Sequence, residues 1–442
     1  MFRSSWIVVV GLLSVFVIAG CRSAKESPFA PAPAVHSTQQ SGMRIPRLAT
    51  SPPASRLGLP ATTLPAFETS RPDATESLPG SAAGFRVVAV REMGPMEQLP
   101  VIQGRDGCIS ALSNGKSKWV YGDTVMKQNG VDGSNWRDNT TSWTTDLDAS
   151  NLITGFAQDS DSLGVPYEFL PHTADELLFN QRMSDPGCVG DSCGYEFALW
   201  PGQVVPDPAR NRTLYFFGKI YRNNSIFIGD GTGIDVQIGD DPLTRPILRP
   251  TAADPTLMWD INEPAYGSGY TVVNDTLYAY APHLNFLSQD ISVARVPLAD
   301  VLTRDAWRYY AGNGVWSADI NAGVIIFSGG SYQSVHWNPY VGKYLAIYSR
   351  PLSNKIMLRA ADRPEGPWTQ EVLLLTGKKP GIANSVDYFG MAHPEYEGSG
   401  GRYDYVGYYH PTGFLAGETR IVQIEFGPKA AATLRSPQVA GR

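Results

Sequence analysis

Two aspartates flank one short hairpin pattern near the start of the aromatic-rich part of the chain. Residues 104–124, GRDGCISALSNGKSKWVYGDT, contain two apolar runs around the polar stretch SNGKS. Asp106 stands at the entry to the first run and Asp123 at the exit from the second. Strand interiors disfavour Asp, so an acid at each end needs an explanation. Two neighbouring carboxyl groups can act as a general acid–base pair, as the hydrolysis of a glycosidic bond requires.

The elements that would position these acids form a repeat. The stretch KWVYGDTV (118–125) recurs in character at 213–221, 276–283, 343–350 and 403–410, each time after a polar turn and another partly apolar run. From residue 276 the units follow at intervals of 67 and 60 residues (276 to 343, 343 to 403), which leaves room for two more strands in each. Five units of four strands predict an all-β, five-bladed β-propeller. A decorated β-sandwich is the alternative, but it would not need five equivalent hairpins.

In a propeller blade, the first strand lines the central channel and the second runs back beside it. The start of the first strand and the end of the second therefore open on one face, where we expect Asp106 and Asp123. The same argument brings residues from the other four blades to this rim. They are Trp200, Lys219, Tyr221, Tyr266, Ser268, His283, Ser334, His336, Arg350, His393, Glu395 and His410. The set contains four of the six histidines of the chain, which indicates a functional site.

A series of motifs in a fixed order resembles a known family. The motifs are GRDG, YGDT, AYGSG, ARVPLADVLTRDAWRYY, SVHWNPYVGKYLAIYS, LRAADRPEGPWTQ and FGMAHPEY. In this order they resemble the lipoprotein-type propellers of domain-of-unknown-function family 4185, over residues 100 to 410. The resemblance implies a relation to five-bladed glycoside hydrolases, and some members of the family cleave D-arabinan.

The analogy with related five-bladed enzymes suggests a role for each acid. Asp106 is expected to be the catalytic base, with Asp123 as the first choice for the acid and Glu395 as the second. The expected substrate-binding residues are Arg105, Trp200, Tyr266, Ser268, His283, His336, Arg350 and His393. Each role has a structural alternative, because an Asp at a strand end often caps a turn and aromatic residues often fill a core.

The first residues predict export and anchoring. Arg3 precedes an apolar run, residues 6–18, that is short for a membrane span, and Ile18-Ala19-Gly20-Cys21 resembles a bacterial lipobox. We therefore expect a signal peptide (1–20) and a lipid on Cys21 that anchors the protein to a bacterial membrane, the outer membrane or cell surface. A plain secretory signal with a chance Cys is the alternative. A Pro/Ser/Thr-rich flexible linker (21–85), the propeller (86–428) and a flexible tail (429–442) complete the predicted organisation.

The remaining cysteines and acids suggest local structure. Cys188 and Cys193 in PGCVGDSCG suit a small disulfide loop in an exported protein, with free thiols as the alternative, and Cys108 is expected to be buried. No cofactor is required by the predicted chemistry. Asp146 and Asp148 in WTTDLDAS are candidate ligands for a structural Ca²⁺ ion, although their spacing matches no known calcium loop.

Charge limits the choice of partner. The formal net charge is −6 and the sequence contains no Lys/Arg cluster, so nucleic acid is not expected as a partner. Two functions remain open on the sequence. One is an anchored glycoside hydrolase that acts on a polysaccharide such as D-arabinan, and the other is a non-catalytic propeller that binds a glycan or a protein on the same rim.

Overall fold

The computed structural model describes residues 85–223, 226–284, 289–383 and 385–428. The predicted signal peptide, the lipidated Cys21, nearly all of the linker and the C-terminal tail lie outside these residues. Within them the fold is all-β, with one α-helix, α2 (Ala174–Met183). No helix in these ranges has the length and apolar character needed to cross a membrane.

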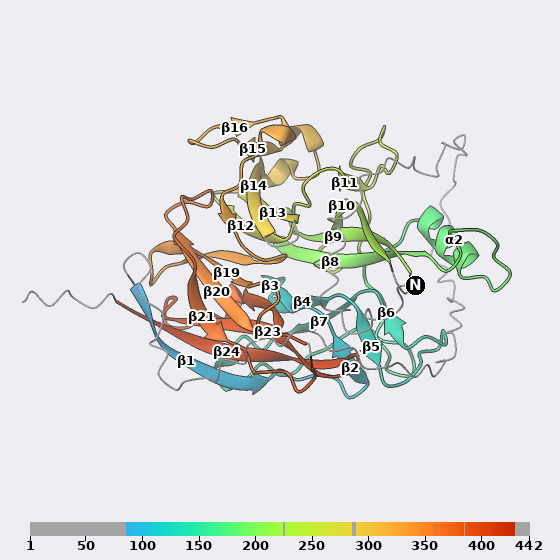
Figure 1. Cartoon of the computed structure of the whole chain (residues 1–442), viewed down its shortest axis with the longest axis horizontal. Helices are drawn as coiled ribbons and strands as arrows, with labels where there is room; N and C mark the ends of the chain where they lie inside the picture. The colour runs from blue at the N-terminus through green and yellow to red at the C-terminus, as the bar shows by residue number, and fades with distance from the viewer. Residues whose placement is uncertain (1–84, 224–225, 285–288, 384, 429–442) are drawn as a thin grey trace, which may run out of the picture.

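Four antiparallel sheets follow one another along most of the chain (Figure 1). The first contains β8 (Glu196–Asp207), β9 (Arg212–Arg222), β10 (Phe227–Ile238) and β11 (Leu257–Asp260). The second contains β12 (Gly269–Val273), β13 (Thr276–Leu284), β14 (Gln289–Pro297), β15 (Arg308–Tyr310) and β16 (Trp316–Ser317), with β17 (Phe327–Ser328) beside β14. The third contains β18 (Ser334–Asn338), β19 (Lys343–Ser349), β20 (Lys355–Ala361) and β21 (Val372–Thr376).

The fourth sheet joins the two ends of the described chain. It contains β22 (Tyr388–Ala392), β23 (Tyr403–Gly413) and β24 (Ala416–Pro428), and β1 (Phe85–Pro95) pairs with β24 at its edge. The earliest strand thus completes the latest sheet, which fixes the N-terminal segment against the C-terminal one through backbone hydrogen bonds.

The predicted first hairpin forms parts of two three-stranded sheets. One contains β3 (Ile109–Ser113), β4 (Lys116–Tyr121) and β7 (Thr140–Thr144), and the other contains β2 (Ile102–Arg105), β5 (Thr124–Met126) and β6 (Trp136–Arg137). The hairpin pairing is interrupted at residues 106–108 on one side and 122–123 on the other. The described residues therefore form six sheets, and the count of five blades stays a prediction.

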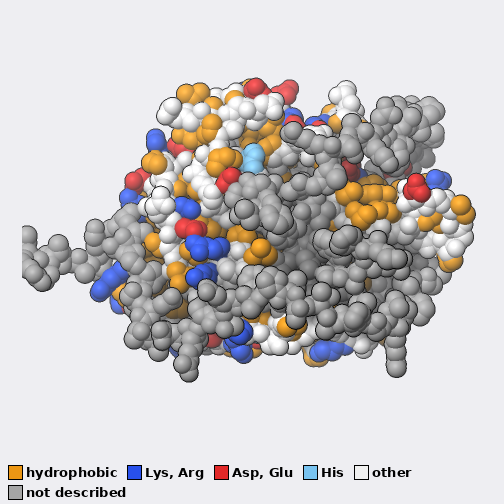
Figure 2. All heavy atoms as spheres, in the orientation of Figure 1, with side chains coloured by type: hydrophobic (Ala, Val, Ile, Leu, Met, Phe, Trp, Pro, Cys, Tyr) orange, Lys and Arg blue, Asp and Glu red, His pale blue; other side chains and the backbone are white. Residues whose placement is uncertain are grey.

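The first strands of successive sheets lie against one another. β3 contacts β8, β8 contacts β12, β12 contacts β18, and β18 contacts β22. Between the sheets lie large buried side chains, such as Phe216, Trp259, Tyr266 and Trp307 between the β8–β11 and β12–β16 sheets. Burial of these aromatic faces is the main force that holds neighbouring sheets together. On the face shown in Figure 2, acidic and basic side chains of the described part are interspersed with hydrophobic ones.

Candidate active site

Asp106 and Asp123 lie beside each other where the first hairpin is interrupted. The backbone N–H of Asp106 donates to the carbonyl oxygen of Asp123 at 2.9 Å, and the N–H of Gly122 donates to the carbonyl oxygen of Asp106 at 2.8 Å. Two residues, Gly122 and Asp123, therefore oppose one, which is the pattern of a β-bulge. A bulge changes the direction of a side chain relative to the regular pleat, and here both acids line the same pocket.

The Asp106 carboxyl is half-buried and is hydrogen-bonded to a tyrosine. The Tyr388 hydroxyl donates to Asp106 Oδ1 at 2.6 Å. Burial and the charge of Asp123 raise the pKa of Asp106 to about 7, although the hydrogen bond from Tyr388 acts in the opposite direction. A carboxyl group with this pKa holds its proton near neutral pH, which a general acid must do.

The Asp123 carboxylate forms a buried ion pair. Arg222 Nη1 lies 2.9 Å from Asp123 Oδ1 and 3.2 Å from Oδ2, and Trp200 Nε1 donates to Oδ1 at 3.2 Å. The same guanidinium also pairs with Asp138 and Glu196. Burial raises the pKa of Asp123 to about 6, while Arg222 opposes this rise. Because Arg222 donates two hydrogen bonds to it, Asp123 is the member of the pair that is better stabilised in the ionised form.

The two acids line a small pocket that shares walls with a larger one. The small pocket has a cavity volume of about 20 Å³, and Asp106, Asp123, Trp200, Tyr332 and Phe389 contribute to its walls. The larger pocket has a cavity volume of about 110 Å³, and Trp200 and Tyr332 are also part of its wall. Its remaining lining includes Phe216, Phe217 and Phe227 of the β8–β11 sheet.

Several predicted substrate-binding residues lie at the larger pocket. Trp200, Tyr266 and Ser268 are part of its wall. The Tyr266 ring is completely buried, and its hydroxyl lies 3.3 Å from Ser292 Oγ. His283 Nε2 lies 2.8 Å from the same Ser292 Oγ, and burial lowers the pKa of His283. His283 is thus behind the wall rather than in it.

Glu395, the second choice for the acid, lines neither of the two pockets, and its role as the acid stays a prediction. Ser117 Oγ, at the start of β4, donates to Glu395 Oε1 at 2.8 Å, and Ser110 Oγ is also hydrogen-bonded to this oxygen. Asp123 follows the other end of β4, six residues further on. At about 3.3 Å per strand residue, Ser117 lies about 20 Å from Asp123, and Ser110 lies about 13 Å from Asp106.

His393 lies at the same end as Glu395, inside the core. Its Nδ1 atom is 2.6 Å from Ser110 Oγ, and its ring lies 4.3 Å from the Trp119 ring, centroid to centroid. Burial lowers the pKa of His393 to about 3, which keeps the imidazole neutral. The prediction placed His393 at the start of a strand, but Pro394 ends the strand β22 and begins a short 3₁₀ turn, Pro394–Tyr396. The residue at the pocket end of β22 is Tyr388.

Three further residues that were predicted to bind substrate make their contacts outside the two pockets. The Arg105 guanidinium is buried over the Tyr121 ring, at 3.7 Å from its centroid, and burial lowers the pKa of Arg105. Arg350 pairs with Glu371. His336 is in the middle of β18 and lies 3.0 Å from Asp404, so it too is not a wall residue of either pocket.

Sequence reasoning missed Tyr388, Arg222 and Tyr332. Tyr388 and Tyr332 lie at or just before the start of β22 and β18, two to seven residues earlier than the rim residues predicted for these strands. Placing each strand start where the aromatic run begins would have found them. Arg222 is the last residue of β9, next to the predicted rim residue Tyr221, and alternation along a strand puts the two on opposite faces.

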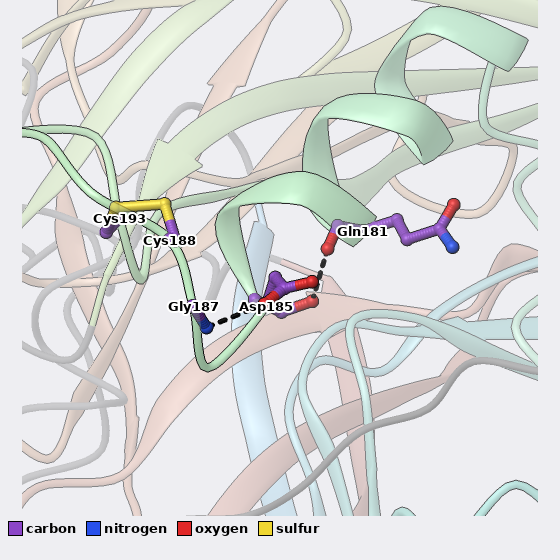
Figure 3. The surroundings of a disulfide bond; sticks show 6 residues. Gln181, Asp185, Gly187, Cys188 and Cys193 are labelled. Atoms are coloured by element: carbon purple, nitrogen blue, oxygen red, sulfur yellow. Dashed lines mark hydrogen bonds between the residues drawn. A yellow bond between two sulfur atoms is a disulfide. The ribbon is translucent and has the colours of Figure 1, made fainter.

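The predicted cysteine pair is joined by a disulfide in a loop after α2 (Figure 3). The Cys188 and Cys193 sulfurs are 2.03 Å apart, and Asp185 Oδ1 accepts a hydrogen bond from the N–H of Gly187 in the same loop. Cys108 is a buried free thiol. Asp146 and Asp148 accept hydrogen bonds from nearby backbone N–H groups, and a structural Ca²⁺ ion at these acids stays a prediction.

The fold and the pocket define the class of the protein. It is an all-β protein in which two carboxyl groups of raised pKa lie side by side in a pocket next to an aromatic-lined one. Residues 251–414 match the model of a family described as "Domain of unknown function (DUF4185)", which confirms the resemblance for that segment. No curated protein matches the chain.

Solved structures that are similar to this chain include two glycoside hydrolases. A family 117 glycoside hydrolase produced by the marine bacterium Zobellia galactanivorans is 11% identical, with a TM-score of 0.43, over 76% of this chain and 90% of that one. The GH43_1 enzyme from Xanthomonas citri, solved in complex with xylotriose, is 12% identical, with a TM-score of 0.41, over 76% and 90%.

Proposed function

We propose that this protein is a glycoside hydrolase that reacts at the pocket containing Asp106 and Asp123. One observation carries the proposal. Two carboxyl groups with raised pKa values but different partners line one pocket, Asp106 with a tyrosine hydroxyl and Asp123 with an arginine. In such enzymes, different environments give the two carboxyl groups different pKa values, so that one acts as the acid and the other as the base or nucleophile.

The environments favour the reverse of the roles expected from the sequence. Asp106 is the proposed acid, because burial and the neighbouring Asp123 charge favour its protonated form. Asp123 is the proposed ionised partner, because Arg222 stabilises its charge. During cleavage Asp106 would give its proton to the leaving oxygen, while the Asp123 carboxylate stabilises the positive charge that develops on the sugar ring. A water molecule would then attack the ring carbon and return a proton to the Asp106 carboxylate, which restores both groups.

The proposed scaffold is a five-bladed propeller. Four sheets supply four blades, and the interrupted first hairpin with β7 supplies the remaining one. The contacts in the series β3, β8, β12, β18 and β22 support this arrangement, as does the pairing of β1 with β24, which would close the ring.

The proposed substrate is a polysaccharide, and D-arabinan is the first candidate because of the family resemblance. The larger pocket supports a ligand that extends beyond one sugar unit, since it shares Trp200 and Tyr332 with the acid pair. Aromatic walls suit the apolar faces of sugar rings.

A non-catalytic propeller that binds a glycan or a protein is the second candidate. It is favoured by the Asp123 carboxylate, which is only 6% exposed and already paired with Arg222. Asp106, in contrast, has no ion pair among the described residues. The binding function would be preferred if both acids formed ion pairs. Only Asp123 does so among the described residues.

We also propose that the protein is exported and anchored through a lipid on Cys21. The motif Ile18-Ala19-Gly20-Cys21 supports this placement. Incorporation of a labelled fatty acid into the wild-type protein, and its loss in Cys21→Ser, would test it. Equal labelling of both proteins would rule out Cys21 as the lipid site.

The deciding experiment measures the release of reducing ends from a panel of polysaccharides that includes D-arabinan. The full-length protein is compared with Asp106→Asn. Cleavage that disappears in the variant supports both the hydrolase activity and the catalytic role of Asp106. Cleavage that persists in the variant supports the activity but rules out Asp106 as the catalytic acid. Absence of cleavage by folded protein, with retention on an immobilised glycan, supports the binding function.

A further inference from the structure

His336, Glu397 and Asp404 converge between two neighbouring sheets, away from the proposed active site. His336 is on β18, Asp404 is the second residue of β23, and Glu397 follows the 3₁₀ turn Pro394–Tyr396. One nitrogen or oxygen atom from each side chain lies within 4.8 Å of those of the other two. His336 is 6% exposed and Asp404 is completely buried, so water has little access to the cluster.

The converging atoms are buried and contact only one another. His336 Nε2 lies 3.0 Å from Asp404 Oδ2 and 3.7 Å from Glu397 Oε1, and no side chain outside the cluster is a hydrogen-bond partner of these three atoms among the described residues. Buried polar atoms are nearly always fully paired, so three such atoms with no partner outside their own cluster indicate a missing partner.

A second buried histidine–aspartate pair in the same protein behaves differently. His410 Nδ1 is hydrogen-bonded to Asp387 Oδ1 at 2.8 Å. No third metal-binding side chain joins this pair in the described part of the chain. The His410 pair is therefore an ordinary buried hydrogen bond, and it provides an internal comparison for the His336 cluster.

The charge of the cluster favours a cation. Two carboxylates, Glu397 and Asp404, face one imidazole, and within the described ranges the ion pairs of these two acids all go to His336. Neither acid is paired with a Lys or Arg there. A buried acidic group without a cation is costly, and a divalent ion would remove this cost.

The spacing also fits a metal ion with short bonds. Zinc is bound at about 2.0–2.2 Å by imidazole nitrogen and carboxylate oxygen, and tetrahedral angles then put neighbouring ligand atoms about 3.3 Å apart. The two separations from His336 Nε2, 3.0 and 3.7 Å, lie on either side of this value. Ca²⁺ prefers six to eight oxygen ligands at longer distances, so one nitrogen and two carboxylates suit it less well.

We propose that His336, Glu397 and Asp404 bind a divalent transition-metal ion, Zn²⁺ or Mn²⁺. The ion would connect β18 in one sheet to β23 in the next, and so stabilise the contact between these sheets. The site is separate from the Asp106 pocket, because none of its three ligands lines either pocket. Hydrolysis of a glycan does not depend on this assignment.

The test uses the full-length protein and three variants. Metal content is measured by elemental analysis, and thermal unfolding is followed after EDTA treatment and again after addition of Zn²⁺, Mn²⁺ or Ca²⁺. Glu397→Gln is the main variant because Glu397 is the most exposed ligand, and Asp404→Asn is the second. Asp387→Asn is the matched control, because it changes the other buried histidine–aspartate pair.

We expect about one Zn²⁺ or Mn²⁺ ion per chain in the wild type and in Asp387→Asn, and a Tm that EDTA lowers and the metal restores. Glu397→Gln should bind the metal at least tenfold more weakly, and its Tm should not respond to EDTA. The proposal is overturned if neither Zn²⁺ nor Mn²⁺ changes the Tm of the stripped wild type, or if only Ca²⁺ does. Equal metal binding by Glu397→Gln would also overturn it.

Discussion

The backbone of Asp106 is hydrogen-bonded to that of Asp123 across a β-bulge, with the Asp106 N–H 2.9 Å from the Asp123 carbonyl oxygen. This single relationship explains why a hairpin carries an acid at each end. The bulge interrupts the pairing between β2–β5 and β3–β4, and both carboxyl groups turn into one pocket instead of following the pleat.

Replacement of Asp106 by Asn should remove activity while a matched change at Glu395 should not. Asn cannot donate the proton that the proposed mechanism requires, so turnover should fall by about 10²–10⁴-fold. Glu395→Gln can keep its hydrogen bonds to Ser110 and Ser117 and lies away from the pocket, so turnover should stay near the wild-type value. A large loss in Glu395→Gln, with little loss in Asp106→Asn, would contradict the site.

The pH dependence of kcat/KM should be bell-shaped, with its maximum between about pH 6 and 7. Activity should fall as the pH rises through about 7, because Asp106 loses the proton it has to donate. It should also fall as the pH drops through about 6, because Asp123 becomes protonated. The two limbs belong to the coupled pair rather than to either residue alone. A profile that keeps rising above pH 8 would be incompatible with Asp106 as the acid.

Tyr388→Phe should move the basic limb of this profile to higher pH. The Tyr388 hydroxyl donates to Asp106 and stabilises its ionised form, so its removal should raise the pKa of Asp106 further. Tyr409→Phe is the control, because the Tyr409 ring lies 5.0 Å from that of Tyr388 and loses a hydroxyl without losing this hydrogen bond. The same limb position in both variants would mean that Tyr388 does not tune Asp106.

Arg222→Met should destabilise the fold strongly. The change leaves Asp123 and Asp138 buried without their cation, and breaking a buried ion pair in this way costs about 3–5 kcal/mol. Arg210→Met is the comparison. Arg210 pairs with exposed Asp275 and with Asp207, and Asp207 keeps Arg212 as a second partner, so the loss of stability there should be much smaller. Chemical denaturation of both variants measures the difference, and equal midpoints would contradict the central position of Arg222.

Gly407→Ala should be destabilised by about 2 kcal/mol or more. A Cβ atom at this position would lie 2.3 Å from His393 Nε2, and the buried imidazole packed on Trp119 has no room to move. Gly381→Ala is the control, because nothing lies within 4 Å of the added atom. Thermal unfolding of the two variants gives the comparison, and an unchanged Tm in Gly407→Ala would mean that His393 is not held in this place.

The sequence alone determined the all-β class, because the repeated pairs of aromatic and β-branched runs around polar turns allow little else. It also placed Asp106 and Asp123 together, since their positions relative to one hairpin are local. The pairing of neighbouring strands depends on short-range spacing, which can be counted along the chain.

Only the tertiary structure decided which distant residues share the pocket. Tyr388 and Arg222 come from other sheets, and a shift of a few residues in the expected start of β22 replaced Tyr388 with His393 and Glu395. In a strand, such a shift moves a residue along the sheet and can turn it to the other face. The protonation state of each acid likewise could not be predicted from the sequence. Burial of the two carboxyl groups and the ion pair between Asp123 and Arg222 arise only when the sheets pack together.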